Sequence, residues 1–124
     1  MPKNVLVIED DLANILLMRK ILMDEDINVD VVSDAISAWE KLKTNRYDLF
    51  VVDLNLPFGK NGFEFLSRLR SLDEYKSVPV IAITAYIGIF TREDCLAKGF
   101  DYYFSKPFDI ESFVKTVKKF LNKK

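Results

Sequence analysis

Carboxylate, hydroxyl and ammonium side chains follow four short apolar runs of this sequence. Glu9 and Asp10 come directly after the first run, Asp53 after another, Thr84 after the next, and Lys106 shortly after the last. Clustered carboxylates are hard oxygen ligands that suit Mg²⁺. An aspartate beside such a cation can attack phosphorus and become an acyl phosphate, while an ammonium and a hydroxyl stabilise the phosphoryl oxygens. These residue types therefore predict Mg²⁺-dependent phosphoryl chemistry if the fold brings them together.

The elements that must position these side chains are predicted from the apolar pattern. Five short runs are typical of strands: residues 5–8, 29–32, 49–52, 80–83 and 102–104. The first, third and fourth are continuous β-branched or aromatic runs, as in strands buried on both faces of a parallel sheet. The stretches between and after them predict helices at about 12–24, 35–45, 62–71, 90–98 and 110–122.

Local signals support the predicted helices. Gly99 is placed to end the fourth helix, and Asp109 and Asp11 are placed to cap the fifth and the first. Apolar residues at helical spacing predict the buried faces of two helices. These residues are Ala35, Ala38, Trp39 and Leu42 in the second helix, and Ile110, Phe113, Val114, Val117 and Leu121 in the fifth.

Five alternating strands and helices predict one domain, over residues 1–124, with a doubly wound α/β sandwich. In such sheets, sites gather at the carboxyl ends of the strands. The polar residues that follow the runs should therefore meet in one crevice. Three carboxylates against one lysine would leave a local charge of about −2, which is unfavourable unless a divalent cation binds there.

Each of these residues also has a simpler explanation when taken alone. Asp53 could form a turn or cap a helix, and Glu9 and Asp10 could begin a helix, where acids are favoured by the dipole. Thr84 could be a β-branched filler of an apolar strand, and Lys106 an ordinary loop cation. The joint pattern favours a site, because independent accidents would not all fall at the same edge of one sheet.

Composition excludes several classes of function. The 124 residues carry a net charge of −1 from 18 basic and 19 acidic side chains, which gives no case for direct nucleic-acid or membrane binding. The absence of histidine excludes His-based triads and His-ligated zinc. A single cysteine, Cys95, rules out an internal disulfide, and the N-terminal apolar run is too short for a signal peptide or a membrane span. We expect a cytoplasmic protein in which Cys95 is a packing residue.

Four motifs occur in a specific order: VLVIEDD, DLNLP, IAITA and YFSKPF. From Val5 to about Leu121, the sequence with these motifs resembles a response-regulator receiver domain. The resemblance implies a flavodoxin-like (βα)5 three-layer sandwich with strand order 2-1-3-4-5. It also implies a phosphorelay protein that accepts a phosphoryl group from a sensor histidine kinase or a phosphotransfer protein.

The same resemblance assigns a role to each acidic residue of the site. It places Glu9 and Asp10 in the pocket that binds Mg²⁺, and it favours Asp10 over Glu9 as the residue in direct contact with the ion. It makes Asp53 the phosphoacceptor and a further ligand. Asn55 would complete the metal shell with its backbone carbonyl. Mn²⁺ is expected to substitute for Mg²⁺.

The remaining roles concern phosphoryl contacts and switching. The resemblance makes Thr84 the switch hydroxyl, Ala85 a backbone N–H donor to the phosphoryl group, and Tyr103 an aromatic switch. Lys106 would pair with the phosphoryl group, and its bond to Pro107 is expected to be cis.

By resemblance, phosphorylation draws Thr84 inward, Tyr103 follows, and the face formed by residues 90–98, 102–104 and 110–122 repacks. Ile87, Ile89 and Phe90 on that face predict a surface for a downstream protein or a homodimer, although they could simply seat the helix on the sheet. Two departures from the family pattern stand out. The stretch from Pro57 to Gly62 is one residue longer than usual, and Tyr86 lies at a position expected to affect phosphate lifetime.

Three other classes of protein remain as alternatives. A phosphohydrolase of the haloacid-dehalogenase kind needs an acid two residues after the nucleophile, where this chain has Asn55. A flavodoxin-like binding protein would need a hydroxyl- and glycine-rich phosphate loop after the first strand. A pseudo-receiver would act only as an interaction module. We expect no turnover enzyme: the chain should catalyse only its own phosphorylation and dephosphorylation.

Overall fold

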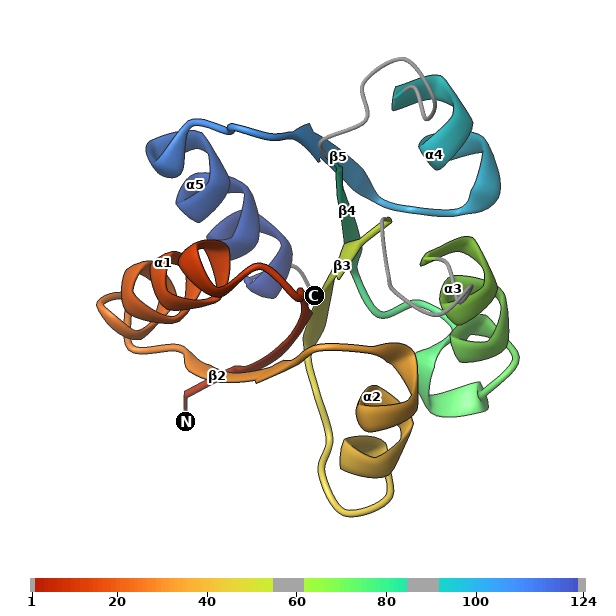
Figure 1. The fold of residues 1–124 in the computed structure, drawn as a ribbon. Coiled ribbons are helices and arrows are strands. Elements are labelled where there is room, and N and C mark those ends of the chain that lie inside the picture. Colours follow the sequence, from red (N-terminus) through yellow and green to blue (C-terminus); the bar gives the residue numbers. More distant parts are fainter. Residues whose placement is uncertain (1, 55–61, 85–91, 123–124) are drawn as a thin grey trace.

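The computed structural model describes residues 2–54, 62–84 and 92–122. Within them, a parallel five-stranded sheet has the order β2-β1-β3-β4-β5 (Figure 1). The strands are β1 (Asn4–Ile8), β2 (Asn28–Val32), β3 (Leu49–Asp53), β4 (Val80–Thr84) and β5 (Tyr102–Ser105). This order confirms the predicted doubly wound α/β fold.

Helices alternate with the strands along the chain. They are α1 (Leu12–Met23), α2 (Ala35–Leu42), α3 (Gly62–Arg70), α4 (Arg92–Lys98) and α5 (Ile110–Leu121), with a short 3-10 turn η1 (Asp73–Tyr75) that the sequence pattern did not predict. Among these described helices, none has the length and apolar content needed to cross a membrane.

Aspartate side chains cap three of the helices. Each accepts a hydrogen bond from the backbone N–H three residues further on, which satisfies a donor that the first helical turn leaves unpaired. The pairs are Asp11 with Asn14 at 3.1 Å, Asp34 with Ser37 at 2.7 Å, and Asp109 with Ser112 at 2.8 Å. The predicted caps of α1 and α5 are therefore confirmed.

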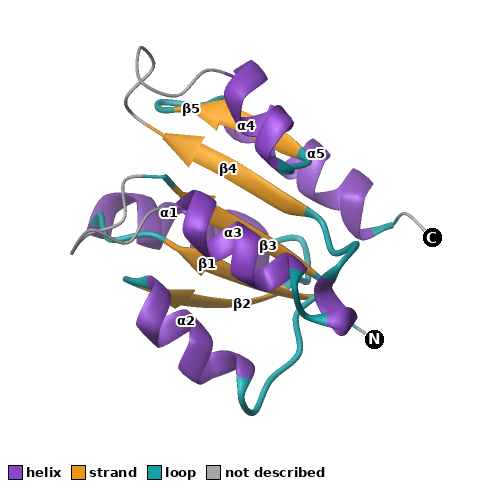
Figure 2. Cartoon of the chain, turned by 90° about the vertical axis from the view of Figure 1, so that its right-hand side faces the viewer, coloured by secondary structure: helices purple, strands orange, loops and turns teal. Residues whose placement is uncertain are grey.

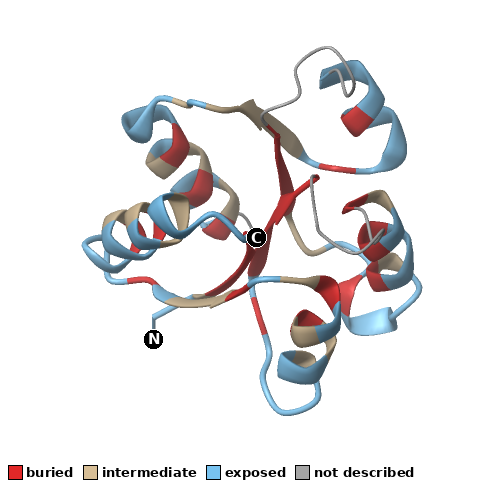
Figure 3. Cartoon of the chain, in the orientation of Figure 1, coloured by how far each residue is buried: buried red, intermediate tan, exposed pale blue. Residues whose placement is uncertain are grey.

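The helices cover both faces of the sheet. α1 and α5 lie on one face, and α2, α3 and α4 lie on the other (Figures 1 and 2). Side chains of successive strand residues point to opposite faces, so Val5 and Val7 join the core under α1 and α5, whereas Leu6 and Ile8 join the core under the other helices. The inner strands are buried (Figure 3), as their continuous apolar runs predicted.

Two glycines allow backbone geometry that other residues would resist. Gly99 ends α4 with a φ of 112°, in the region that favours glycine, as predicted for this position. Gly62 begins α3 in close contact with β3: a Cβ there would lie 2.5 Å from Leu54 Cδ2 and 3.0 Å from Val52 Cγ1. A side chain at residue 62 would therefore require the Leu54 side chain to move.

Two details of the predicted helices were wrong. α2 ends at Leu42 rather than near residue 45: the backbone N–H groups of Lys43 and Thr44 donate to carbonyls three residues back, at 3.3 Å each, so the last turn tightens. Ile110 was predicted to be buried with Phe113, but it is 44% exposed. It is the first residue of α5 and follows the carboxyl edge of the sheet, so it lies at the end of the helix rather than over the strands.

Candidate functional site

The turn between β1 and α1 places Glu9 inside the fold and Asp10 at its surface. The Glu9 backbone N–H donates to the Val32 carbonyl at 2.9 Å and extends the pairing of β1 with β2. The Glu9 side chain is fully buried, and its Oε2 accepts a hydrogen bond from the Asp11 backbone N–H at 3.1 Å. Asp10 is exposed. The two neighbouring acids therefore face different environments.

Asp53 is the last residue of β3, between β1 and β4. It is paired in register with Ile83, and only 2% of its surface is exposed. The Lys106 Nζ lies 3.0 Å from Asp53 Oδ2 and 2.9 Å from Glu9 Oε1. One ammonium, from the segment after β5, thus lies between two buried carboxylates from different strands.

Thr84 ends β4 next to this group. Its hydroxyl-bearing side chain is buried, and its carbonyl accepts a hydrogen bond from the Lys106 backbone N–H at 2.8 Å. This backbone contact fixes the start of the segment that carries the ammonium. The peptide bond that follows, between Lys106 and Pro107, is cis.

The protonation equilibria of the site reflect burial and pairing. Burial raises the pKa of the Glu9 carboxyl, although the contacts with Lys106 and with the Asp11 N–H act in the opposite direction. Burial alone would lower the pKa of the Lys106 ammonium, but Glu9 and Asp53 outweigh it, and that pKa is raised. Lys106 is therefore held in its charged form while it remains between the two carboxylates.

The residues present fit a divalent cation. Carboxylate oxygens of Glu9, Asp10 and Asp53 lie within 4.8 Å of one another. Glu9 Oε1 is buried and forms an ion pair with Lys106 Nζ at 2.9 Å, but it accepts no well-oriented hydrogen bond from the described residues. A buried carboxylate oxygen without a full set of hydrogen bonds is costly, and coordination to a divalent cation that prefers oxygen ligands would offset that cost.

Tyr103 lies further from the carboxylates, on β5. It is paired in register with Ala82 and packs, half-buried, against the core under α2, α3 and α4. Burial raises the pKa of its hydroxyl, with a smaller effect from the Cys95 thiol of α4. Cys95 itself is buried, and burial raises the pKa of its thiol to about 11, in agreement with the predicted packing role.

Several predicted site residues lie outside the part of the chain that the structure describes. They are Asn55, Ala85, Tyr86, Ile87, Ile89 and Phe90, together with residues 57–61 of the longer loop. Of the predicted site residues that are described, the structure brings together Glu9, Asp10, Asp53, Thr84 and Lys106 at the carboxyl edge of the sheet, while Tyr103 lies further along β5.

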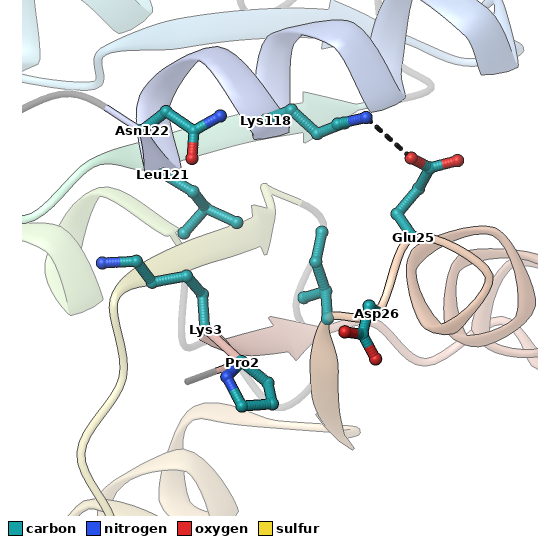
Figure 4. A pocket seen from close by; sticks show the side chains of 8 residues that line it. Pro2, Lys3, Glu25, Asp26, Lys118, Leu121 and Asn122 are labelled. Carbon is teal, nitrogen blue, oxygen red and sulfur yellow. Dashed lines mark hydrogen bonds and ion pairs between the residues drawn. The ribbon is translucent and has the colours of Figure 1, made fainter.

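A second concave region lies at the opposite edge of the sheet. The region is lined by Pro2 and Lys3 before β1, Asp26 after α1 and Leu121 at the end of α5. An ion pair of 2.8 Å between Lys118 and Glu25 borders it (Figure 4). Its residues do not include those predicted to do chemistry, so the carboxyl edge remains the candidate site.

Two features of the site were missed from the sequence. One is the hydrogen bond from the Asp11 N–H to Glu9, which depends on the backbone geometry of a turn and has no residue-type signal. The other is an exposed apolar line on α1, formed by Leu12, Leu16 and Met23. The sequence did carry a signal for it, since apolar residues occur all round this helix.

Comparison with known proteins agrees with this geometry. Residues 5–118 match the response regulator receiver domain family. The chain is 31% identical to the polar-differentiation response regulator DivK of Brucella anthropi over 121 residues, which is 98% of both chains. It is 33% identical to the transcriptional activator protein IrlR of Burkholderia pseudomallei, but spans only 50% of that protein.

Solved structures show the same likeness. The receiver domain of the sensor histidine kinase PA1611 from Pseudomonas aeruginosa, which has a magnesium ion coordinated in its active-site cleft, is 27% identical. It superimposes with a TM-score of 0.86 and covers 99% of this chain and 100% of its own. The chain therefore belongs to the family of response regulator receiver domains.

Proposed function

We propose that this receiver domain accepts a phosphoryl group on Asp53 from the phosphohistidine of a sensor histidine kinase or a phosphotransfer protein. The observation that carries the proposal is the convergence, among the described residues, of two buried carboxylates, one exposed carboxylate, a buried hydroxyl and the Lys106 ammonium at one edge of the sheet. Burial of charged side chains is unfavourable, and clusters of buried ionisable groups are typical of functional sites.

In the proposed reaction, a carboxylate oxygen of Asp53 attacks phosphorus. An O–P bond forms, the P–N bond to the donor histidine breaks, and the imidazole leaves with the bonding electron pair. Lys106 already contacts Asp53 and can pair with the phosphoryl oxygens, while the Thr84 hydroxyl and the backbone N–H of Ala85 would donate hydrogen bonds. Attack of water on phosphorus later restores the carboxylate and releases phosphate, so the chain catalyses only its own modification and its reversal.

Glu9, Asp10 and Asp53 would hold the metal ion, with the Asn55 backbone carbonyl as a further ligand. When bound, Mg²⁺ supplies charge neutralisation at the phosphoryl oxygens. Carboxylate and carbonyl oxygens also suit Mn²⁺, which we expect to substitute.

The exposed apolar line on α1 supports a protein donor that docks on this helix. Leu12, Leu16 and Met23 are 67%, 57% and 58% exposed and follow one side of the helix. The line begins at Leu12, two residues after Asp10, so it leads away from the rim of the site. A donor that reaches Asp53 from this rim would cover these side chains.

Output is proposed to run through the face formed by α4, β5 and α5. Thr84 would be drawn toward the phosphoryl group and Tyr103 would follow, because new charge-assisted contacts favour one of two packings. On the described part of this face, the Arg92 guanidinium lies 5.1 Å from the centre of the Tyr102 ring, beside a depression that Phe108 also lines. With Ile87, Ile89 and Phe90, this face would bind a downstream protein or a second copy of the chain.

Intact mass spectrometry tests the proposed acceptor. After incubation with Mg²⁺ and a small phosphodonor such as acetyl phosphate, the wild type should gain a single phosphoryl group that hydroxylamine removes. Asp53→Asn should gain none, because an amide cannot form the acyl phosphate. A stable phosphoryl adduct on Asp53→Asn would contradict the assignment.

The same experiment separates the alternatives. A chain that forms no adduct and fails to bind beryllofluoride would be an interaction module without phosphorylation. Steady turnover of phosphate esters would indicate a phosphohydrolase, which the amide of Asn55 argues against.

A further inference from the structure

We infer that Asp11 is a positioning residue for the metal site: by capping α1 with its side chain, it holds its own backbone N–H against the buried carboxylate of Glu9. This inference rests on the proposed function, because it assigns Glu9 to the Mg²⁺ site. It gives Asp11 a role beyond the helix cap that its sequence position predicts.

The polar groups of Asp11 have described partners on both sides of the turn. Its backbone N–H donates to Glu9 Oε2 at 3.1 Å. Its side-chain Oδ2 accepts from the Asn14 N–H at 3.1 Å, and its carbonyl accepts from the Ile15 N–H at 2.9 Å. The first turn of α1 therefore fixes the peptide that contacts Glu9.

Glu9 needs such a fixed partner because of where it lies. Its side chain is fully buried, and its other oxygen, Oε1, accepts no well-oriented hydrogen bond from the described residues. The N–H of Asp11 thus engages one carboxylate oxygen and leaves Oε1 toward Asp53 and Lys106, where a cation would bind. A hydrogen bond of this kind orients a ligand without touching the metal, and the loss of such partners typically lowers metal affinity 10- to 100-fold.

The charge of Asp11 could also attract a cation, and this must be separated from its capping role. The Asp11 side chain is exposed, where water and salt screen its field. Asparagine and serine cap helices about as well as aspartate but carry no charge, whereas alanine does not cap. Mg²⁺ affinity should therefore depend on whether the side chain at position 11 can cap α1, and not on whether it is charged.

The experiment measures Mg²⁺ affinity by isothermal titration calorimetry on the full chain. Asp11→Ala should bind Mg²⁺ on the order of 10-fold more weakly than wild type. Asp11→Asn and Asp11→Ser should stay within about twofold of wild type, because both keep the cap. In the metal-free chain, the amide proton of residue 11 should exchange faster in Asp11→Ala than in Asp11→Asn.

Asp34→Ala is the matched control for loss of stability. It removes an equivalent cap, from α2, whose partner is Ser37 and not Glu9. It should weaken Mg²⁺ binding by less than about twofold, since that cap has no link to the metal site. Equal weakening in Asp34→Ala and Asp11→Ala would show a general effect of destabilisation and overturn the inference.

The remaining outcomes are also decisive. Equal weakening in Asp11→Ala and Asp11→Asn would assign the effect to charge, and no weakening in Asp11→Ala would remove the positioning role; either result overturns the inference while the proposed function stands. A wild type that binds no Mg²⁺ would overturn the metal assignment of the proposed function and this inference with it.

Discussion

At the scale of single residues, the site depends on one ammonium between two buried carboxylates. Lys106 lies 2.9 Å from Glu9 and 3.0 Å from Asp53, and Glu9 would otherwise oppose the negative charge of Asp53 at close range. Removal of one member of a buried charge pair is costly, because it leaves the other charge uncompensated. Lys106 therefore stabilises the resting site as well as the proposed phosphorylated one.

Substitution of Lys106 by methionine should destabilise the fold at pH 7 by about 3 kcal/mol. Burial already raises the pKa of the Glu9 carboxyl, and Lys106 acts against that rise, so loss of the ammonium should raise the folded-state pKa of Glu9 further. The loss of stability is therefore present at neutral pH and shrinks as the pH falls through this raised folded-state pKa, because protonation of Glu9 removes the uncompensated charge. Urea unfolding at pH 7 and pH 5, followed by the fluorescence of the single tryptophan, Trp39, measures the effect.

Lys118→Met provides the comparison for this prediction. It breaks the partly exposed ion pair with Glu25 and should cost less than about 1 kcal/mol, with little dependence on pH in this range. If the two lysine variants lost similar stability, or if the loss in Lys106→Met did not change with pH, the buried-pair account would be wrong.

At the scale of elements, the inner side of α1 packs on the sheet and its outer side presents apolar side chains to solvent. Met18 and Leu22 are buried against the sheet, whereas Leu12, Leu16 and Met23 lie in solvent. An exposed apolar line of this kind costs solubility and is typical of a binding surface. Because α1 begins beside the cluster of Glu9, Asp10 and Asp53, its outer side is well placed to contact a macromolecule that reaches Asp53.

Negative charge on this outer side of α1 should slow phosphoryl transfer from a protein donor but not from a small-molecule donor. The double variant Leu12→Glu, Leu16→Glu should receive the phosphoryl group about 30-fold more slowly, because each of the two lost apolar contacts costs about 1 kcal/mol of docking free energy. The measurement uses purified, autophosphorylated histidine kinases, with the fastest donor to wild type chosen from a panel.

Two comparisons make this prediction specific. Phosphorylation by acetyl phosphate should be unchanged in the double variant, since a small donor needs no docking surface. Ile36→Glu, at an exposed apolar position of α2, should transfer at the wild-type rate. An equal loss with the small donor would mean that the substitutions damage the site itself.

At the scale of the whole molecule, the site exists only when the sheet is complete. Its side chains come from the ends of β1, β3 and β4 and from the segment after β5, positions as far apart as Glu9 and Lys106 in the sequence. The unfolded chain has no such cluster. A ligand of the site should therefore bind the folded state and stabilise it by mass action.

Mg²⁺ at 100 times its dissociation constant should raise the free energy of unfolding by about 2.7 kcal/mol. Chelation with EDTA should reverse the gain, and Mn²⁺ should reproduce it. Urea unfolding with and without the cation gives the measurement. Asp53→Asn should show a much smaller gain because it lacks one ligand; a gain equal to that of wild type would place the ion elsewhere.

Much of this architecture could be predicted because local chemistry dictates it. The runs around Val5, Phe50 and Ile81 could only be buried strands, and Gly99 and Asp109 mark helix ends by their own conformational and hydrogen-bonding preferences. Predictions failed at helix ends. The last turn of α2 tightens after Leu42, and Ile110 lies at a helix end that the sheet does not cover.

The sequence by itself determined the order of strands and helices, the family, and the residue types that could do chemistry, because each follows from short-range patterns. Only the tertiary structure decided how those residues differ from one another. It buried Glu9 and exposed Asp10, placed Lys106 between Glu9 and Asp53, and turned the N–H of Asp11 toward Glu9. These outcomes depend on where separate strand ends meet, and no local pattern contains that distance information.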